Sequence, residues 1–440
     1  MRARLPRLRP LDREIAALAV PSLGALVAEP LFVLTDTAMV GHLGAAPLAG
    51  LGLAATVLQT AIGLLVFLAY ATTPLVARRL GAGDRRGALS AGVDGLWLGL
   101  GLGVLLLAVM LPLSSPVIAA FGASGPVEAE ALTYLTISWW GVPGMLLVLA
   151  ATGVLRGLQD VRTPLLVAVV GFGANILLNA ALIYGAGLGV AGSALGTVIA
   201  QWGMAIALVA VVVRAALREG AALRPGLAGL RAAATAGSWL FVRTLSLRIA
   251  LVVTVAVATG LGTVELAAAH VWFAVYSLLA LVLDALAIAG QTLVGHALGA
   301  AEVPRVRATT RRLVGWGVVV GAGLALVLLV LAGPLSVVMT SDAAVRDALP
   351  AALVVLALGL PLAGLVFVLD GVLIGAGDGR YLAVTGILNL LVYLAVLALV
   401  PGLGLLGLLA AFALVYLGAR AATLSARARG TAWIVTGAAR

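Results

Sequence analysis

Long apolar runs, separated by short polar segments, recur along this chain and constrain its fold more than any other feature. A helix that crosses a bilayer needs about 20 apolar residues, and backbone in lipid must satisfy its hydrogen bonds within helices or closed barrels. Only 10% of the residues are charged, against about 25% in soluble domains. We therefore predict an all-α integral membrane protein with twelve transmembrane helices. The predicted spans are 14–41, 47–76, 88–112, 127–155, 163–185, 189–213, 238–260, 264–298, 313–338, 347–375, 381–400 and 402–420.

The arginines alternate between the segments that join these spans. They are concentrated in the N-terminal segment and in every second segment that connects two spans. The connecting segments between these contain no arginine, with Arg346 as the exception. Cytoplasmic loops carry an excess of positive charge. The pattern predicts a multi-pass protein of the cell inner (plasma) membrane with both termini in the cytoplasm.

An internal repeat appears when the chain is shifted by 218 residues. Gly153-Val154-Leu155-x-Gly157 then meets Gly371-Val372-Leu373-x-Gly375, and Pro143 meets Pro361. Each half holds six spans, so the halves are parallel, as in transporters whose substrate path runs between two lobes. The predicted organisation is an N-lobe (1–215), a cytoplasmic linker (216–236), a C-lobe (237–424) and a cytoplasmic tail (425–440).

Several classes of function are excluded by what the sequence contains. The formal charge of +10 follows the membrane topology and indicates no nucleic-acid partner. There is no cysteine, and the three histidines have no metal-ligand spacing, so we expect no metal site. Intramembrane enzymes need clustered carboxylates or a histidine with partners, so we expect no enzyme. There is no nucleotide-binding motif, so uphill transport would depend on an ion gradient.

Ionisable residues inside a span mark a pathway or a buried partner, and two of them lie in the first span. Asp36 lies in its outer half and is a candidate proton or cation site, or else a carboxylate wetted at the helix end. Glu29 lies seven residues earlier on the same helical stripe. Pro30 beside it predicts a bend. Glu29 is a candidate substrate-cavity residue, or a hydrogen-bonded residue at the bend.

The second half offers three more candidates for the substrate cavity. Asp284 is central in its span and either faces the cavity or pairs with Arg248. Asp370 lies nearer the cytoplasmic end of its span, where water could reach it. Arg243, near the start of its span, is expected to extend to the membrane interface.

The residues around Asp36 resemble a known transporter family. The stretch from Ala28 to Gly44 contains Thr35-Asp36-Thr37-Ala38-Met39-Val40-Gly41-His42. It resembles the multidrug and toxic compound extrusion (MATE) family, in particular its DNA-damage-inducible F branch. Segments 283–291 and 371–378 are similar to the same branch. The resemblance implies a V-shaped pair of six-helix bundles that exports organic cations or other amphipathic compounds by alternating access, in exchange for protons or sodium. We expect small amphipathic, cationic organic substrates and a monomeric protein.

The resemblance also implies a cation site in the N-lobe. The matching positions are Asp36, Tyr134, Asn175 and Thr197, with Pro21 at the position of a bending proline. The sequence departs from the pattern at Asn179, where related members can have a second carboxylate. One carboxylate in an apolar bundle suits reversible protonation, so we expect protons as the coupling ion, with no other cofactor.

Two alternatives stay open at this point. A major-facilitator transporter also has twelve helices in two parallel halves, and residues 81–87 imitate a loop signature of that family. The second alternative is a lipid-intermediate flippase of the same superfamily, which would line its cavity with several arginines. In this sequence only Arg248 lies deep enough in a predicted span to have that role.

Overall fold

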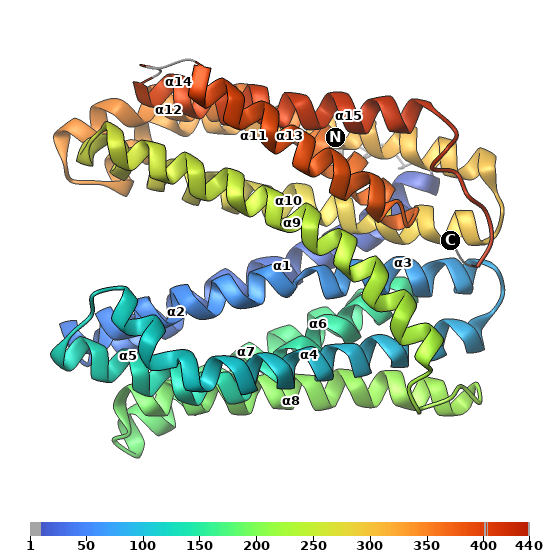
Figure 1. The fold of residues 1–440 in the computed structure, drawn as a ribbon, viewed down its shortest axis with the longest axis horizontal. Coiled ribbons are helices and arrows are strands. Elements are labelled where there is room, and N and C mark those ends of the chain that lie inside the picture. The colour runs from blue at the N-terminus through green and yellow to red at the C-terminus, as the bar shows by residue number, and fades with distance from the viewer. Residues whose placement is uncertain (1–9, 400–401, 403, 439–440) are drawn as a thin grey trace, which may run out of the picture. The chain divides into compact units, whose positions relative to one another are not determined.

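The computed structural model describes residues 10–399, 402 and 404–438. All regular elements in these ranges are helices, and Figure 1 shows them in chain order. Twelve of the helical stretches are long and apolar enough to cross a membrane. The predicted number of spans is therefore confirmed for the described part of the chain.

The helices group into two compact units. One unit is residues 24–237, and the other combines residues 1–23 with 238–440. The unit boundaries fall inside two continuous helices, α1 (Pro10–Gly41) and α9 (Leu227–Leu261).

The unit of residues 24–237 holds most of α1 and the elements up to the start of α9. The pair α2 and α3 forms one predicted span with an interruption at Val66, and α5 and α6 form another that is joined by the short helix η1. The bounds are α2 (Ala45–Leu65), α3 (Phe67–Gly81), α4 (Arg85–Ala120), α5 (Gly125–Ser138), η1 (Trp139–Gly141), α6 (Val142–Gly157), α7 (Arg162–Ala180), η2 (Ala181–Gly185) and α8 (Gly189–Arg218).

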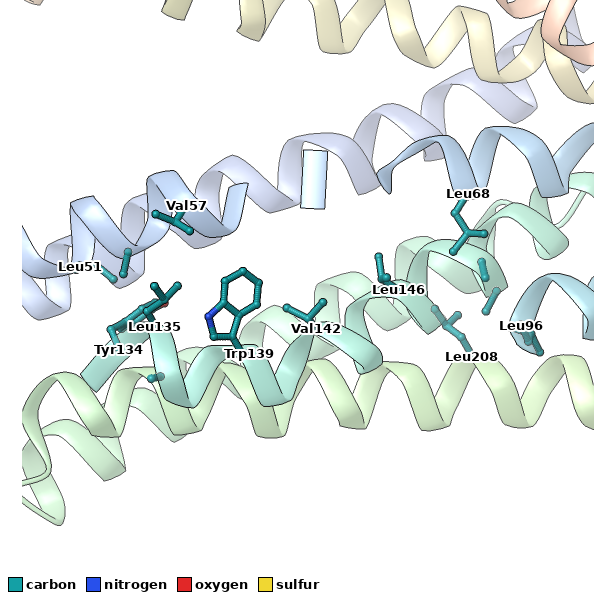
Figure 2. Packing of buried hydrophobic residues seen from close by; sticks show 14 of the residues in the cluster. Leu51, Val57, Leu68, Leu96, Tyr134, Leu135, Trp139, Val142, Leu146 and Leu208 are labelled. Carbon is teal, nitrogen blue, oxygen red and sulfur yellow. The ribbon is translucent and has the colours of Figure 1, made fainter. Parts of the chain in front are cut away.

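The core of this unit is a continuous layer of apolar side chains between its helices. Figure 2 shows Tyr134 and Leu135 towards one end of the layer, Trp139 and Val142 in its middle, and Leu68 and Leu96 towards the other end. The indole of Trp139 is fully buried and donates a hydrogen bond to Ser114 Oγ at 3.0 Å. A buried indole N–H needs such a partner, so this contact fixes the η1 interruption against α4.

The other unit contains the second set of helices. Its bounds are α10 (Thr263–Gly299), α11 (Val303–Met339), α12 (Ala343–Gly375), α13 (Gly379–Leu399), α14 (Gly404–Ala410), η3 (Ala411–Tyr416) and α15 (Leu417–Arg429). The start of α1 is held in this unit by Asp12, whose carboxylate accepts hydrogen bonds from Arg312 and Trp316. Aromatic rings of Trp272, Tyr276, Tyr393, Phe412 and Tyr416 pack against one another in its core.

The 218-residue repeat reappears in the backbone contacts of the two units. A Cβ atom added to Gly153 would lie 2.7 Å from the carbonyl oxygen of Ala69, and one added to Gly371 would lie 2.4 Å from that of Ala287. Both pairs are related by the same offset. Small residues let membrane helices approach backbone to backbone, so the glycines of the repeat mark one helix contact used twice.

The predicted linker is more helical than the sequence suggested. Helix α9 begins at Leu227, after Pro225 and Gly226. The preceding segment is held on its own unit, because Asp94 accepts a hydrogen bond from the amide of Gly226 at 2.8 Å and Trp97 donates one to the carbonyl of Leu223 at 3.0 Å. An apolar window detects only the lipid-facing part of a helix, so it misses a polar extension of this kind.

Candidate functional site

Asp36 lies on α1, and its carboxylate is buried among polar side chains from three other helices. Its Oδ1 accepts hydrogen bonds from Ser193 Oγ at 2.5 Å and from Asn179 Nδ2 at 2.9 Å, and its Oδ2 accepts one from Tyr134 OH at 3.2 Å. Only 5% of the residue is exposed. A buried carboxylate is costly unless it is hydrogen-bonded, and these three donors meet that need, with no ion pair to Asp36 among the described residues.

A second layer of hydrogen bonds orients these donors. Asn179 Nδ2 also lies 3.1 Å from Asn175 Oδ1, and Asn175 Nδ2 donates to Thr197 Oγ1 at 3.3 Å. Asn175 and Asn179 are one turn apart on α7, and Thr197 is on α8. The structure thus brings together all five residues that the sequence assigned to the cation site: Asp36, Tyr134, Asn175, Asn179 and Thr197.

Ser193 is a member of this network that the sequence analysis missed. It lies four residues before Thr197 on α8, so both side chains lie on one face of that helix. This spacing is the one feature of the sequence that could have pointed to Ser193. Serines in apolar helices, however, often bond only to the backbone of their own helix. Only the contact between α8 and α1 shows that Ser193 bonds to Asp36 instead.

The oxygen of the Asn179 side chain is unusual in this site. Asn179 is fully buried, and its Oδ1 accepts no hydrogen bond from the residues that the structure describes. An unused buried acceptor costs about 1–3 kcal/mol. A joint rotation of the Asn179 and Asn175 amides would turn this oxygen towards Asp36, where it could accept hydrogen bonds from a protonated carboxyl group and from Asn175 Nδ2. The network can therefore serve both the charged and the neutral form of Asp36.

A pocket with a cavity volume of about 120 Å³ adjoins Asp36 within the same unit. Its wall is largely apolar and includes Phe32 and Phe172, whose rings stack with centroids 5.2 Å apart. Glu29 also lines it, is exposed, and makes no hydrogen bond or ion pair among the described residues. The pocket therefore combines aromatic faces with two carboxylates.

The predicted bending prolines, Pro21 and Pro30, both lie within α1, which continues as a helix through each of them. A proline inside a helix removes one backbone hydrogen bond and commonly bends the helix. Pro21 lies two residues before the point at which α1 passes from one unit to the other. A bending role for either residue stays a prediction.

The remaining cavity candidates, Asp284, Arg248 and Asp370, belong to the other unit. Asp284 is half-buried on α10. Arg248 is exposed and forms no ion pair in the part of the chain that the structure describes. Asp370 is buried and forms ion pairs with Arg243 and Arg420. The expectation that Arg243 extends to the membrane interface was wrong, because a buried carboxylate on α12 attracts its guanidinium group instead.

No group of three or more His, Cys, Asp or Glu side chains with the geometry of a metal site occurs in the described ranges. The oxygens around Asp36 come from one carboxylate, amides and hydroxyl groups. The chemistry that this donor set offers is therefore the binding and release of a proton or of a hard monovalent cation.

Comparisons with known proteins agree with this architecture. The MatE family model matches residues 21–181 and 239–400. The protein DETOXIFICATION 44, chloroplastic, of Arabidopsis thaliana is 30% identical over 420 residues, covering 92% of this chain and 80% of its own length. DNA damage-inducible protein F of Escherichia coli (strain K12) is 35% identical over 192 residues, 43% of this chain and 42% of its own length.

Solved structures show the same fold. The crystal structure of the Vibrio cholerae MATE transporter VcmN in the bent form superposes with a TM-score of 0.87 at 24% identity, over 95% of this chain and 97% of the other. An outward-facing multidrug resistance transporter of the same family gives a TM-score of 0.85 at 24% identity, over 95% of both chains.

Proposed function

Because the chain belongs to the MATE family of multi-pass membrane transporters, we propose that it is a secondary-active exporter of toxic organic compounds. It exchanges them for protons, and Asp36 is the residue that couples the two movements. The observation that supports this proposal is the position of Asp36. One buried carboxylate, with neutral hydrogen-bond partners, lies on the wall of a largely apolar pocket.

Protons are favoured over sodium by the composition of the site. Asp36 is the only carboxylate in the hydrogen-bond network described above, and the neutral Asn179 contacts it directly. Desolvation favours the neutral form of an acid, whereas the three donors favour its charged form. Because these contributions oppose each other, Asp36 can exist in both its charged and its neutral form. Protonation would remove the negative charge that the hydroxyl groups and Asn179 face, so these donors would reorient. Helix α1 could then repack and alter the pocket.

Small amphipathic cations are the proposed substrates. The stacked rings of Phe32 and Phe172 offer apolar and π surfaces, and a cation over an aromatic face is attracted to it. Glu29 and Asp36 supply negative charge on the same wall. Competition between a cationic substrate and a proton for this charge would link export to proton entry.

The coupling is tested in proteoliposomes loaded with a cationic dye, under an imposed pH gradient or an imposed sodium gradient. We expect the wild-type protein to respond to the pH gradient and Asp36→Asn to lose at least about 90% of that response, as expected when an essential acid is removed. Glu128→Gln, in the first turn of α5, is the matched control and should keep the response. Efflux that follows sodium alone, or coupled efflux by Asp36→Asn, would contradict the proposal.

The proposed orientation places both termini in the cytoplasm of a cell whose plasma membrane holds the protein. The chain has no cysteine, so single cysteines can be labelled directly. Ala82 and Ser341 are exposed and lie in loops assigned to opposite sides. An impermeant maleimide should label Ser341→Cys but not Ala82→Cys from outside intact cells. The reverse result would invert the topology.

A further inference from the structure

Helix α1 is shared between the two compact units. Its residues up to Leu23 group with residues 238–440, and the rest of the helix, which carries Asp36, groups with residues 24–237. Asp12 lies in the first turn of α1, and about 36 Å of helix separate it from Asp36 at about 1.5 Å per residue. Rigid helices can carry energetic coupling between distant sites. Helix α1 can therefore transmit a movement at Asp36 to the other unit, provided that the start of the helix is held there.

Asp12 holds the start of α1 on α11. Its carboxylate accepts hydrogen bonds from Arg312 Nε at 2.5 Å, from Arg312 Nη2 at 2.7 Å and from Trp316 Nε1 at 2.9 Å. Asp12 is only 2% exposed. Arg312 and Trp316 lie one turn apart on one face of α11. A carboxylate that accepts two hydrogen bonds from one arginine forms a strong and directional pair, so this contact fixes the depth and the rotation of α1 at its start.

A second contact joins the same two helices but is more exposed. Arg305 on α11 forms ion pairs with Glu14 on α1 at 3.1 Å and with Glu302 at 3.4 Å, and all three side chains are about half-exposed. Ion pairs between exposed side chains contribute little to stability. The firm attachment of α1 is therefore the one at Asp12, and Glu14 provides a matched control close to it.

The other part of α1 is attached to residues 24–237. Besides the three hydrogen bonds that Asp36 accepts, Tyr184 OH donates one to the carbonyl oxygen of Met39 at 2.7 Å. Helix α1 thus has polar contacts near both of its ends, one set in each unit. Protonation of Asp36 would alter the set around that residue, whereas Asp12 faces a guanidinium group that stays charged. The two attachments therefore differ in their response to a proton.

We propose that Asp12 is a positioning residue for the exchange of substrate and proton. Its contacts with Arg312 and Trp316 hold the start of α1 on α11 through the whole transport cycle, so that repacking of α1 around Asp36 is transmitted to the unit that contains α11. The inference rests on the proposed function, because it concerns the helix that carries the coupling residue.

A cross-link tests whether this contact stays closed, and the native chain has no cysteine that would interfere. Glu14→Cys and Arg305→Cys are introduced together and joined in detergent by a short bifunctional maleimide. With 43% and 44% of their side-chain surface exposed, both positions can react. After reconstitution, we expect the same dye efflux with and without the cross-link. Loss of efflux in the cross-linked sample, but not in Glu14→Cys treated with the same reagent, would overturn the proposal.

Asp12→Asn removes the charge and keeps the shape of the side chain. Efflux should fall about tenfold or more, because a buried arginine contact loses its charged partner. Binding of the dye to the protein in detergent, and the weakening of that binding at low pH, should keep their wild-type values, because the site around Asp36 is intact. The cross-link between positions 14 and 305 should restore efflux in this variant. Glu14→Gln breaks only the exposed ion pair and should leave efflux unchanged.

Wild-type efflux by Asp12→Asn would overturn the proposal, and so would a parallel loss of dye binding and efflux, or a cross-link that does not restore efflux. If Asp12→Asn does not fold, the cross-link in the otherwise unaltered chain still decides. All comparisons use the gradient that drives the wild-type protein, so efflux driven by sodium would contradict proton exchange but not the role of Asp12. Absence of dye efflux under either gradient would contradict the exporter function and this inference with it.

Discussion

The two halves of the chain use the same helix contacts for different chemistry. At the repeat offset of 218 residues, Asp36 corresponds to Thr254, and Asn175 corresponds to Tyr393. In the first half these positions belong to one polar network, in which Asn179 links Asp36 to Asn175. In the second half the hydroxyl groups of Thr254 and Tyr393 lie 2.6 Å apart. The first and fifth spans of each half therefore meet at the same level, but only one half has an acid there.

The surroundings of the two positions differ as much as the residues themselves. Asp36 borders an open pocket. Tyr393 is fully buried against the rings of Phe412 and Tyr416. A hydroxyl pair among packed rings carries no charge to exchange. The two halves therefore share the close contacts between helices, but their buried ionisable residues lie at different positions of the repeat.

The largest effect on the protein is expected from substitutions of the glycines at the helix contact that both halves share. In Gly371→Leu, the new side chain would have to displace the backbone of α10, because its Cβ would lie 2.4 Å from the carbonyl oxygen of Ala287. Overpacking of this kind costs about 1–3 kcal/mol and occasionally more. We expect size-exclusion chromatography of Gly371→Leu to give little monodisperse protein. The same result is expected for Gly153→Leu.

Gly101→Leu is the matched control for these variants, because nothing lies within 4 Å of its added Cβ. It should be recovered in normal amounts. Normal recovery of Gly371→Leu as well would show that the repeated glycines are not required for the helix contact.

Asn179→Asp sharpens the comparison by adding a second acid to the first half. The new carboxylate would lie next to Asp36, since the present Nδ2–Oδ1 distance is 2.9 Å. Two adjacent carboxylates cannot both be charged without a cation or a proton between them. We expect dye efflux to acquire a response to the sodium gradient that the wild-type protein lacks. An unchanged ion preference would mean that the residue at position 179 does not select the ion.

Ser193→Ala tests the donor that the sequence did not reveal. A hydrogen bond to a charged group contributes about 1.5–3 kcal/mol, and this one stabilises the charged form of Asp36. Release of the proton should become slower, and efflux driven by the pH gradient should fall severalfold without the complete loss expected for Asp36→Asn. Wild-type rates over the whole pH range would exclude Ser193 from the coupling network.

The smallest effect is expected for Tyr393→Phe in the second half. The variant removes one buried hydroxyl, while Thr254 keeps its hydrogen bond to the carbonyl of Ala250 at 2.7 Å. A loss of about 1 kcal/mol in stability is expected, with efflux unchanged. Thermal unfolding and dye efflux of the same preparation measure both quantities. A loss of coupling at normal stability would give the second half a part in ion exchange.

The sequence by itself determined the features that depend on local composition. Twelve apolar runs of sufficient length indicated the spans, and the structure has twelve candidate spans in its described part. The glycines at offset 218 predicted a repeat that recurs as backbone contacts. Asp36 could be singled out because a charge inside an apolar run is costly wherever that run packs.

Tertiary structure alone decided which side chains meet. Ser193 lies 157 residues from Asp36 along the chain, and Arg243 lies 127 residues from Asp370. Whether such residues touch depends on the rotation and depth of each helix against its neighbours. Those quantities are fixed by the packing of many small side chains together, and no single stretch of sequence carries them. For this reason the sequence located the charges of Asp36 and Asp370, but only the folded chain showed a hydroxyl and amide shell around one and two arginines around the other.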